Sequence, residues 1–318
     1  MQVLFSVGEN VESDFRKMTG AEELLNALSD CGISWRLYHS GSSEAVMRLD
    51  DSDPADTVVV TDSEDLAAEA CRKGFCVVGL RQQEQAEVQL PLGQKTGKWF
   101  KGVKTVCSSA EAVSPLFLWN SLRRSNHLPA VIAETKRLII RESIPDDFEK
   151  IWEIRHSCGP DSGMGDPCSD KESERDQFHA YIRESYDFFG YGYWSVCLKS
   201  MDSSGNVFKN EPDTDTIAGR IIGLCGLAPL CDSSQNLQEN PEGPELGYLI
   251  DPAERQRGFG EEACRAVLEY AACELGFEEL YARIAKTNQA SVRLAQKLGF
   301  TCLGGELWMI SLRNSMPG

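Results

Sequence analysis

The residues best suited to chemistry are two arginines and two glycines in one short loop. Arg255 and Arg257 precede Gly258 and Gly260, between an apolar run that ends at Ile250 and a helical pattern. The first N–H groups of a helix lack an intrahelical partner, and the helix dipole favours an anion there. Glycine lets an anion approach the main chain because it has no Cβ atom. The loop therefore fits a phosphate or pyrophosphate site, although a plain strand–turn–helix needs similar glycines.

The charge of the whole chain makes this loop a local exception. Lys plus Arg number 32 and Asp plus Glu number 49, which gives a net charge of −17. Such an acidic chain repels phosphate backbones and anionic lipid, so we expect no nucleic-acid partner and no membrane partner. The hydrophobic content of 42% is that of an ordinary globular protein, and 318 residues predict two domains.

Cysteine and histidine are not spaced as metal ligands. The 12 cysteines include no Cys-x-x-Cys pair, and the 4 histidines are scattered. Zinc or iron–sulfur binding therefore lacks its usual spacing, and we expect no metal. The cysteines suit small apolar positions in a reducing compartment. Neither a signal-peptide pattern nor a long apolar run is present, so we expect a cytoplasmic protein.

The first part of the chain alternates strand and helix patterns. β-branched or apolar runs predict strands at 2–7, 34–38, 57–61, 75–80 and 103–107. Helical spacing predicts helices at 19–31, 64–73 and 110–124. This order predicts a small doubly wound α/β domain over residues 1–130. Pro129 and residues 130–134 are interpreted as a junction to the second domain, residues 131–318.

The second part must position the glycine-containing loop. Apolar runs predict strands at 135–141, 193–199, 217–227, 245–250 and 280–285. Helices are expected at 144–156, at 171–186 and from residue 259 to Gly276. Pro145 and the acidic residues after it favour a helix start at that point.

The segment from Pro244 to Gly260 resembles motif A of the GNAT superfamily of acyl-CoA-dependent N-acyltransferases, whose loop reads Arg/Gln-x-x-Gly-x-Gly/Ala. Residues 288–300 are similar to the family's Asn-x-x-Ser…Lys-Leu-Gly-Phe ending. Residues 135–141 look like its opening strand. The run from Gly190 to Trp194 resembles the branch that contains ribosomal-protein N-terminal acetyltransferases. The resemblance covers about residues 135–312.

The resemblance implies an α+β domain with a mixed sheet whose fourth and fifth strands splay apart, and acetyl-CoA as cosubstrate. The pantetheine arm would lie in that split, bonded to the backbone of Leu249 and Ile250. Asn288 and Ser291 would flank the arm, and Asn288 would equally serve as an ordinary helix N-cap. The pyrophosphate would sit on backbone N–H groups of four loop residues: Arg257, Gly258, Phe259 and Gly260.

The reaction implied is direct transfer of an acetyl group to an amine in a ternary complex. Glu245 is the candidate base, acting through water, although a solvated acid at a strand end is an equal interpretation. Many family members carry a Tyr directly after Leu in the last helix, where this chain has Ala295. Solvent or Ser291 would then serve the leaving thiolate. Tyr248 either faces the cleft or belongs to the core.

The acceptor is open on the sequence alone. Asp161 and Asp166 lie in a loop rich in Gly, Pro and Asp that could hold a cationic amine, and Tyr193 could add an aromatic wall. A flexible acidic loop and a core strand aromatic are the plainer interpretations. A peptide N-terminus, a Lys side chain, an aminoglycoside and a polyamine all fit as the acceptor. A homodimer is also compatible with the sequence.

Residues 58–80, with Asp62 and Ser63 after an apolar strand, resemble the late part of haloacid-dehalogenase-like phosphatases. The resemblance covers residues 1–125 loosely. The nucleophile motif Asp-x-Asp-x-Thr is absent, because Ser-Val-Gly-Glu-Asn stands at residues 6–10. The resemblance thus implies a degenerate domain that serves dimerisation, a lid, ligand sensing or structure alone. For the whole chain, a non-catalytic acyl-CoA sensor and a fusion with an active phosphatase are the alternatives.

Overall fold

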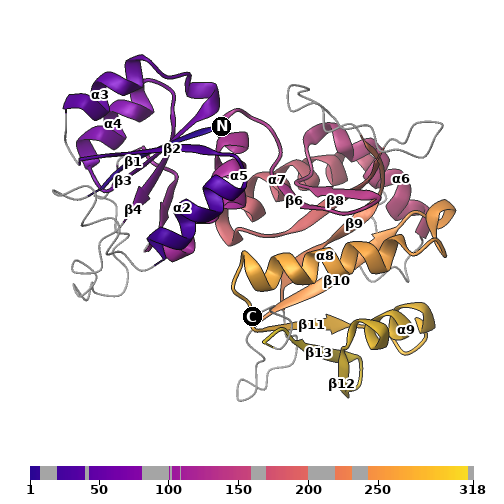
Figure 1. Ribbon diagram of the computed structural model, residues 1–318. Helices are drawn as coiled ribbons and strands as arrows, with labels where there is room; N and C mark the ends of the chain where they lie inside the picture. The colour runs from indigo at the N-terminus through magenta and orange to yellow at the C-terminus, as the bar shows by residue number, and fades with distance from the viewer. Residues whose placement is uncertain are drawn as a thin grey trace, which may run out of the picture. The chain divides into compact units, whose positions relative to one another are not determined.

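The computed structural model describes residues 1–7, 20–39, 43–80, 100, 102–107, 109–158, 170–199, 219–230 and 243–313. The chain divides into two compact units, Met1–Ala130 and Val131–Gly318 (Figure 1).

The first unit is built on a parallel sheet with the strand order β2-β1-β3-β4-β5. Its strands are β1 (Gln2–Ser6), β2 (Ser34–Tyr38), β3 (Thr57–Thr61), β4 (Cys76–Leu80) and β5 (Thr105–Cys107). Its helices are α2 (Ala21–Asp30), α3 (Ser43–Asp50), α4 (Glu64–Arg72) and α5 (Pro115–Ser125). All paired strands run parallel, which confirms the α/β class.

Both faces of this parallel sheet are covered. Val3 and Phe5 belong to a buried cluster with residues of α2 and α5, whereas Leu4 belongs to a second cluster with residues of α3 and α4. Successive strand side chains point to opposite faces, so the two clusters lie on the two sides of the sheet. Helix α3 was not predicted, because it buries only Ala45 and Leu49 and leaves Met47 exposed.

The second unit is built on a mixed sheet with the order β12-β13-β11-β10-β9-β8-β7-β6. Its strands are β6 (Val131–Glu134), β7 (Leu138–Arg141), β8 (Tyr193–Lys199), β9 (Gly219–Pro229), β10 (Pro244–Ile250), β11 (Glu279–Arg283), β12 (Thr301–Gly304) and β13 (Leu307–Ser311). Its helices are α6 (Phe148–Cys158), α7 (Lys171–Phe189), α8 (Phe259–Cys273) and α9 (Gln289–Leu298). The β10–β11 pair is parallel and the other described pairs are antiparallel.

The start of this unit differs from the sequence prediction. The expected junction at residues 130–134 is wrong, because Val131–Glu134 forms strand β6 and pairs antiparallel with β7. Ile132 of this strand is 2% exposed and joins the main core, which explains why a short apolar run becomes a strand. Residues 200–218, which include the start of the strand expected at 217–227, lie outside the described residues. Among the described helices, none is long and apolar enough to cross a membrane.

Candidate functional site

The parallel strands β10 and β11 are paired at a single position and then separate. Their parallel pairing holds only Glu245 opposite Tyr281, whereas β10 pairs with β9 at seven consecutive positions from Pro244 to Ile250. The rest of β10 therefore diverges from β11, which confirms the splayed pair that the family resemblance implied. A cavity of about 90 Å³ opens beside this split. Its walls include Glu245, Tyr248, Asn288, Ser291, Ala295 and Tyr193.

The side chains of β8 and β9 show which face of the sheet each residue occupies. The Trp194 ring lies 5.5 Å from that of Tyr270 in α8, and the Cys225 Sγ atom lies 4.0 Å from Cys264 Sγ in the same helix. Strand side chains alternate between faces, so Tyr193 and Leu224 must point away from α8.

Strand β10 contributes to both faces at the split. A Cβ atom built on Gly260 of α8 would lie 3.2 Å from the Tyr248 ring, so Tyr248 faces α8. A Cβ built on Gly247 would lie only 2.6 Å from Tyr193 Oη, so glycine is required there to admit the tyrosine. Glu245 has the same strand parity as Gly247 and shares that second face. Since Glu245 and Tyr248 both line the cavity, it has walls on both faces of the sheet.

The loop after β10 presents backbone N–H groups to solvent. Gln256 and Gly258 have left-handed backbone angles, with φ values of 60° and 82°, and α8 starts at Phe259. No side chain caps the start of α8. The backbone at residues 256–258 is exposed, so an anion can approach the open N–H groups at the helix start. The residues present thus fit a pyrophosphate group.

The two loop arginines are held differently. Arg257 pairs with Glu254 at 2.5 Å, yet its side chain is 57% exposed and available to an anion. Arg255 donates from Nε to the Ile250 carbonyl at 3.0 Å and from Nη2 to Cys158 Sγ at 2.9 Å. The Arg255 guanidinium therefore joins the end of β10 to the end of α6, and the Ile250 carbonyl already has a partner.

A buried carboxylate anchors Arg257. Glu254 is 6% exposed and also pairs with Arg220 of β9 at 2.6 Å. The hydrogen bond from Arg220, helped by Arg257, lowers the pKa of Glu254 below its usual value. Glu254 is therefore ionised at neutral pH and holds the base of the loop against β9.

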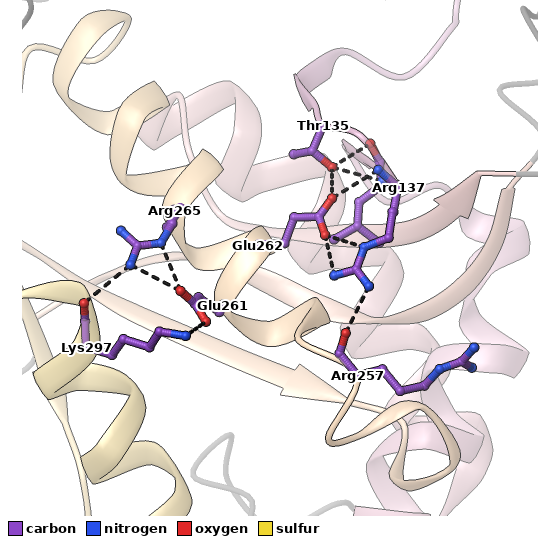
Figure 2. A network of polar contacts seen from close by, with 8 residues as sticks. Thr135, Arg137, Arg257, Glu261, Glu262, Arg265 and Lys297 are labelled. Atoms are coloured by element: carbon purple, nitrogen blue, oxygen red, sulfur yellow. Dashed lines mark hydrogen bonds and ion pairs between the residues drawn. The ribbon is translucent and has the colours of Figure 1, made fainter. Parts of the chain in front are cut away.

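Arg137 is a site residue that sequence reasoning missed. Figure 2 shows its guanidinium between Glu262 and the loop, with Nε donating to Glu262 at 2.7 Å and Nη1 donating to the Arg257 carbonyl at 2.9 Å. Thr135 Oγ1 donates to the same carboxylate at 2.7 Å. Arg137 also lies 4.4 Å from the centroid of the Phe259 ring. Local spacing could not reveal this contact, because 120 residues separate Arg137 from Arg257.

Both acidic residues in the first turn of α8 are neutralised by cations. Burial opposes ionisation of Glu262, but hydrogen bonds from Thr135 and Arg137 outweigh it and lower its pKa. Glu261 accepts hydrogen bonds from Lys297 at 2.5 Å and from Arg265 at 3.1 Å (Figure 2), and the Lys297 bond is the main reason for its lowered pKa. The helix start therefore stays favourable to an anion despite the two carboxylates.

Glu245 lies at the point where the strands begin to part. It is half-buried, and its Oε1 atom accepts a hydrogen bond from the Arg283 backbone N–H at 3.2 Å. Burial, followed by the negative charge of Glu245, raises the pKa of Tyr193. The carboxylate and the phenol therefore share one local environment at the cavity wall.

The main chain at Tyr193 is fixed by two other tyrosines. Its N–H donates to Tyr181 Oη at 2.7 Å, and its carbonyl accepts from Tyr186 Oη at 2.6 Å. Both partners belong to α7, so the helix sets the position of the Tyr193 ring. Burial raises the pKa of the Tyr186 phenol, which keeps it a hydrogen-bond donor at neutral pH.

On the α8 face, the cavity wall carries two hydroxyl groups. Tyr248 Oη and Ser291 Oγ lie 3.1 Å apart. Asn288 is the N-cap of α9, because its Oδ1 accepts from the Ser291 N–H at 3.1 Å. Burial raises the pKa of Tyr248, partly offset by the hydrogen bond with Ser291, so this phenol stays protonated near neutral pH. Ala295 is 5% exposed in the same wall, and its methyl group brings no hydrogen-bond donor.

A second, larger cavity lies between α6, α7 and the sheet. Its volume is about 360 Å³, and Tyr193 and Leu224 belong to its wall. Tyr193 thus lines both cavities. Asp161 and Asp166, the other expected acceptor contacts, lie outside the described residues. Within the described ranges, no group of three His, Cys, Asp or Glu residues is placed to hold a metal.

The comparisons with known proteins match one family model and parts of two relatives. The sequence profile described as "Acetyltransferase (GNAT) domain" matches residues 137–301, more than half of the chain. An uncharacterized Bacillus subtilis protein, YkkB, is 35% identical over 85 residues, or 27% of this chain and 46% of that protein. The mouse "Alpha/beta-tubulin-N-acetyltransferase 9" is 35% identical over 63 residues, or 19% of this chain and 26% of that one. The matched stretches span less than half the length of these relatives.

A solved structure is similar at the level of the fold. The structure described as "yncA, a putative ACETYLTRANSFERASE from Salmonella typhimurium with its cofactor Acetyl-CoA" is 17% identical with a TM-score of 0.37. The match covers 55% of this chain and 94% of that protein.

Proposed function

This chain belongs to the GNAT acetyltransferase family, and we propose that it transfers an acetyl group from acetyl-CoA to a primary amine that attacks directly in a ternary complex. The observation that carries the proposal is the split between β10 and β11, whose cavity has walls on both faces of the sheet. An acyl donor on the α8 face and an amine on the other face can meet only through such an opening.

The residues that we assign to acetyl-CoA binding belong to β10, to the loop after it and to the starts of α8 and α9. The open N–H groups of Arg257, Gly258, Phe259 and Gly260, with the exposed Arg257 guanidinium, suit the pyrophosphate. The backbone of Leu249 and Ile250, past the single paired position of β10 and β11, would bond the pantetheine arm, which requires Arg255 to release the Ile250 carbonyl. Asn288 and Ser291 would flank the arm. Acetyl-CoA supplies the activated thioester, whose carbonyl carbon is the group attacked.

Glu245 is the group that we assign as general base. An amine is protonated at neutral pH and must lose a proton before it can attack. The Glu245 carboxylate, held by the Arg283 N–H, accepts that proton directly or through a water molecule. The amine nitrogen forms the new bond to the acetyl carbon as the carbon–sulfur bond breaks.

The leaving sulfur needs a hydrogen-bond donor, which Ala295 cannot supply. The Tyr248 and Ser291 hydroxyls line the same cavity and point toward each other at 3.1 Å. We assign this pair to stabilise the thiolate, with Ser291 on the helix and Tyr248 on the strand.

Acetyl-CoA binding and turnover test the proposal together. Calorimetric titration of the full chain should show binding in the micromolar range, and thiol release should appear with at least one of a peptide N-terminus, a Lys peptide, an aminoglycoside or a polyamine. Glu245→Gln should lower kcat roughly 10²- to 10⁴-fold, since general-base catalysis contributes that much, and leave acetyl-CoA binding unchanged.

The matched control is Glu269→Gln, an exposed acid on α8, which should leave kcat unchanged. A folded protein that gives no heat with acetyl-CoA would disprove the proposal. Binding without thiol release from any of the amines would instead support the non-catalytic sensor.

A further inference from the structure

One side chain, that of Tyr193, stands between the two cavities of the second unit. The smaller cavity, of about 90 Å³, opens beside the split, and the larger one has a volume of about 360 Å³. Among the described residues, Tyr193 alone belongs to both walls. Its side chain therefore borders the smaller cavity on one side and the larger cavity on the other.

The Tyr193 side chain reaches the split by crossing a neighbouring strand. Strand β9 lies between β8 and β10, and Gly226 of β9 is paired with both Tyr193 and Gly247. A Cβ atom built on Gly247 would lie 2.6 Å from Tyr193 Oη. The phenol therefore extends across β9 as far as β10. Paired residues on neighbouring strands share a face, so the two glycines leave the sheet free of side chains beneath the ring.

Helix α7 holds the main chain from which this ring extends. The Tyr193 N–H donates to Tyr181 Oη at 2.7 Å, and the Tyr193 carbonyl accepts from Tyr186 Oη at 2.6 Å. The start of β8 is thus anchored on both sides of Tyr193. The ring is a fixed part of the cavity walls, and a ligand that needs its space has to displace it.

The position of this ring bears on the acyl group of the donor. Under the proposed function acetyl-CoA lies on the α8 face, whereas Tyr193 points away from α8. An acyl chain that passes from the α8 face into the split therefore ends at the Tyr193 ring. Glu245 lines the smaller cavity and is absent from the described wall of the larger one, so we place the attack on the smaller side of the ring.

The volume of the smaller cavity suits a short acyl group. About 90 Å³ is roughly three times the volume that one water molecule takes up in the liquid. A thioester carbonyl and one methyl group fill such a space. A longer chain has room only beyond Tyr193, in the larger cavity, whose apolar wall residues include Phe148, Ile151, Phe178 and Leu224.

We propose that the Tyr193 ring sets the length of the acyl group that this protein accepts, and restricts the donor to acetyl-CoA and similarly short acyl-CoA molecules. This inference rests on the proposed acetyl transfer and names a specificity-determining residue for it. A small side chain in place of Tyr193 joins the two cavities and admits a longer acyl chain.

Calorimetric titration of the full chain with acetyl-CoA and with hexanoyl-CoA tests this role. We expect the wild-type protein to bind acetyl-CoA about tenfold or more tightly than hexanoyl-CoA, since a closed pocket discriminates by about that factor against an added methylene group. In Tyr193→Ala the ratio of the two Kd values should shift about tenfold or more toward hexanoyl-CoA, because the longer chain then buries its apolar surface in the larger cavity.

A second variant keeps the test valid if Tyr193→Ala does not fold. Tyr193→Leu retains an apolar side chain on β8 but is too short to reach Gly247, so it should shift the ratio in the same direction. Tyr193→Phe is the matched control, because it keeps the ring and should keep the wild-type ratio. Leu224→Ala enlarges the larger cavity alone and should keep that ratio as well.

Two results would overturn the inference and leave acetyl transfer intact. One is a wild-type protein that binds hexanoyl-CoA as tightly as acetyl-CoA. The other is a folded Tyr193→Ala or Tyr193→Leu protein that keeps the wild-type ratio of Kd values. Absence of heat with acetyl-CoA in the folded wild-type protein would instead defeat the proposed function, and the inference with it.

Discussion

Under the proposed function, two side chains at the split would stabilise the leaving thiolate. Tyr248 and Ser291 bring two hydroxyls to the cavity wall where Ala295 brings none. The Tyr248 phenol is kept protonated because burial raises its pKa, so it can donate a hydrogen bond across the neutral pH range. A donor aimed at developing negative charge acts in the transition state more than in the ground state.

Tyr248→Phe should therefore lower kcat about 10- to 100-fold and leave the Kd for acetyl-CoA within a factor of about two. Steady-state thiol release and calorimetry measure the two quantities. Tyr281→Phe serves as the control, because its phenol donates to Glu279 at 3.0 Å instead of lining the cavity. A Tyr248→Phe enzyme with full kcat would show that Ser291 or solvent is sufficient.

Among single residues, the sequence identifies site candidates where they lie within a few positions of one another. Gly258 and Gly260 follow the arginines within a few residues, and the loop was found for that reason. The alternation of strand side chains does not decide whether Tyr248 faces the cleft or the core, because it does not say which face of the sheet α8 covers.

At the scale of elements, the shape of the loop at residues 255–260 depends on contacts from a residue that precedes strand β7. Arg137 precedes β7 and donates to the Arg257 carbonyl, while its Nε atom bonds Glu262 of α8 (Figure 2). The Arg137 side chain is 33% exposed, so solvent partly screens its ion pair with Glu262. It still fixes the carbonyl next to Gly258, so it sets the direction of the N–H groups beyond it.

Arg137→Ala should weaken acetyl-CoA binding roughly tenfold, since hydrogen bonds to charged groups contribute about 1.5–3 kcal/mol each before screening. Lys136→Ala removes the same charge from the neighbouring exposed residue and should leave the Kd almost unchanged. Calorimetric titration of both variants separates loop geometry from simple electrostatic attraction. Equal losses in the two variants would refute the positioning role of Arg137.

The same scale explains which elements were predictable. The strands Ser34–Tyr38 and Tyr193–Lys199 were predicted at the observed bounds, since apolar or β-branched runs between turn residues mark them clearly. The sequence predicts a junction where strand β6 lies, because four residues after a proline are too few to show a strand's apolar pattern. Its pairing with β7 is a tertiary effect.

At the scale of the whole molecule, the two units have separate cores. Every residue of the two clusters around the parallel sheet lies between Val3 and Leu122, and the cluster of the mixed sheet lies between Ile132 and Leu312. The similarity of the first unit to haloacid-dehalogenase-like phosphatases stays a prediction. Its parallel sheet alone does not distinguish a structural appendage from a lid or a sensor.

Removal of the first unit distinguishes these roles. A chain of residues 129–318 keeps β6 and the whole mixed sheet, so it should unfold cooperatively and bind acetyl-CoA within about threefold of the full chain, because its core is its own. If the first unit is a structural appendage, kcat should also stay within about threefold. A tenfold or larger change in kcat or in the acetyl-CoA Kd, in a fragment whose circular dichroism shows a folded protein, would assign the first unit a lid or sensing role. Scanning calorimetry of the full chain supplies the independent check, since separate cores should give two transitions, and the fragment should reproduce one of them.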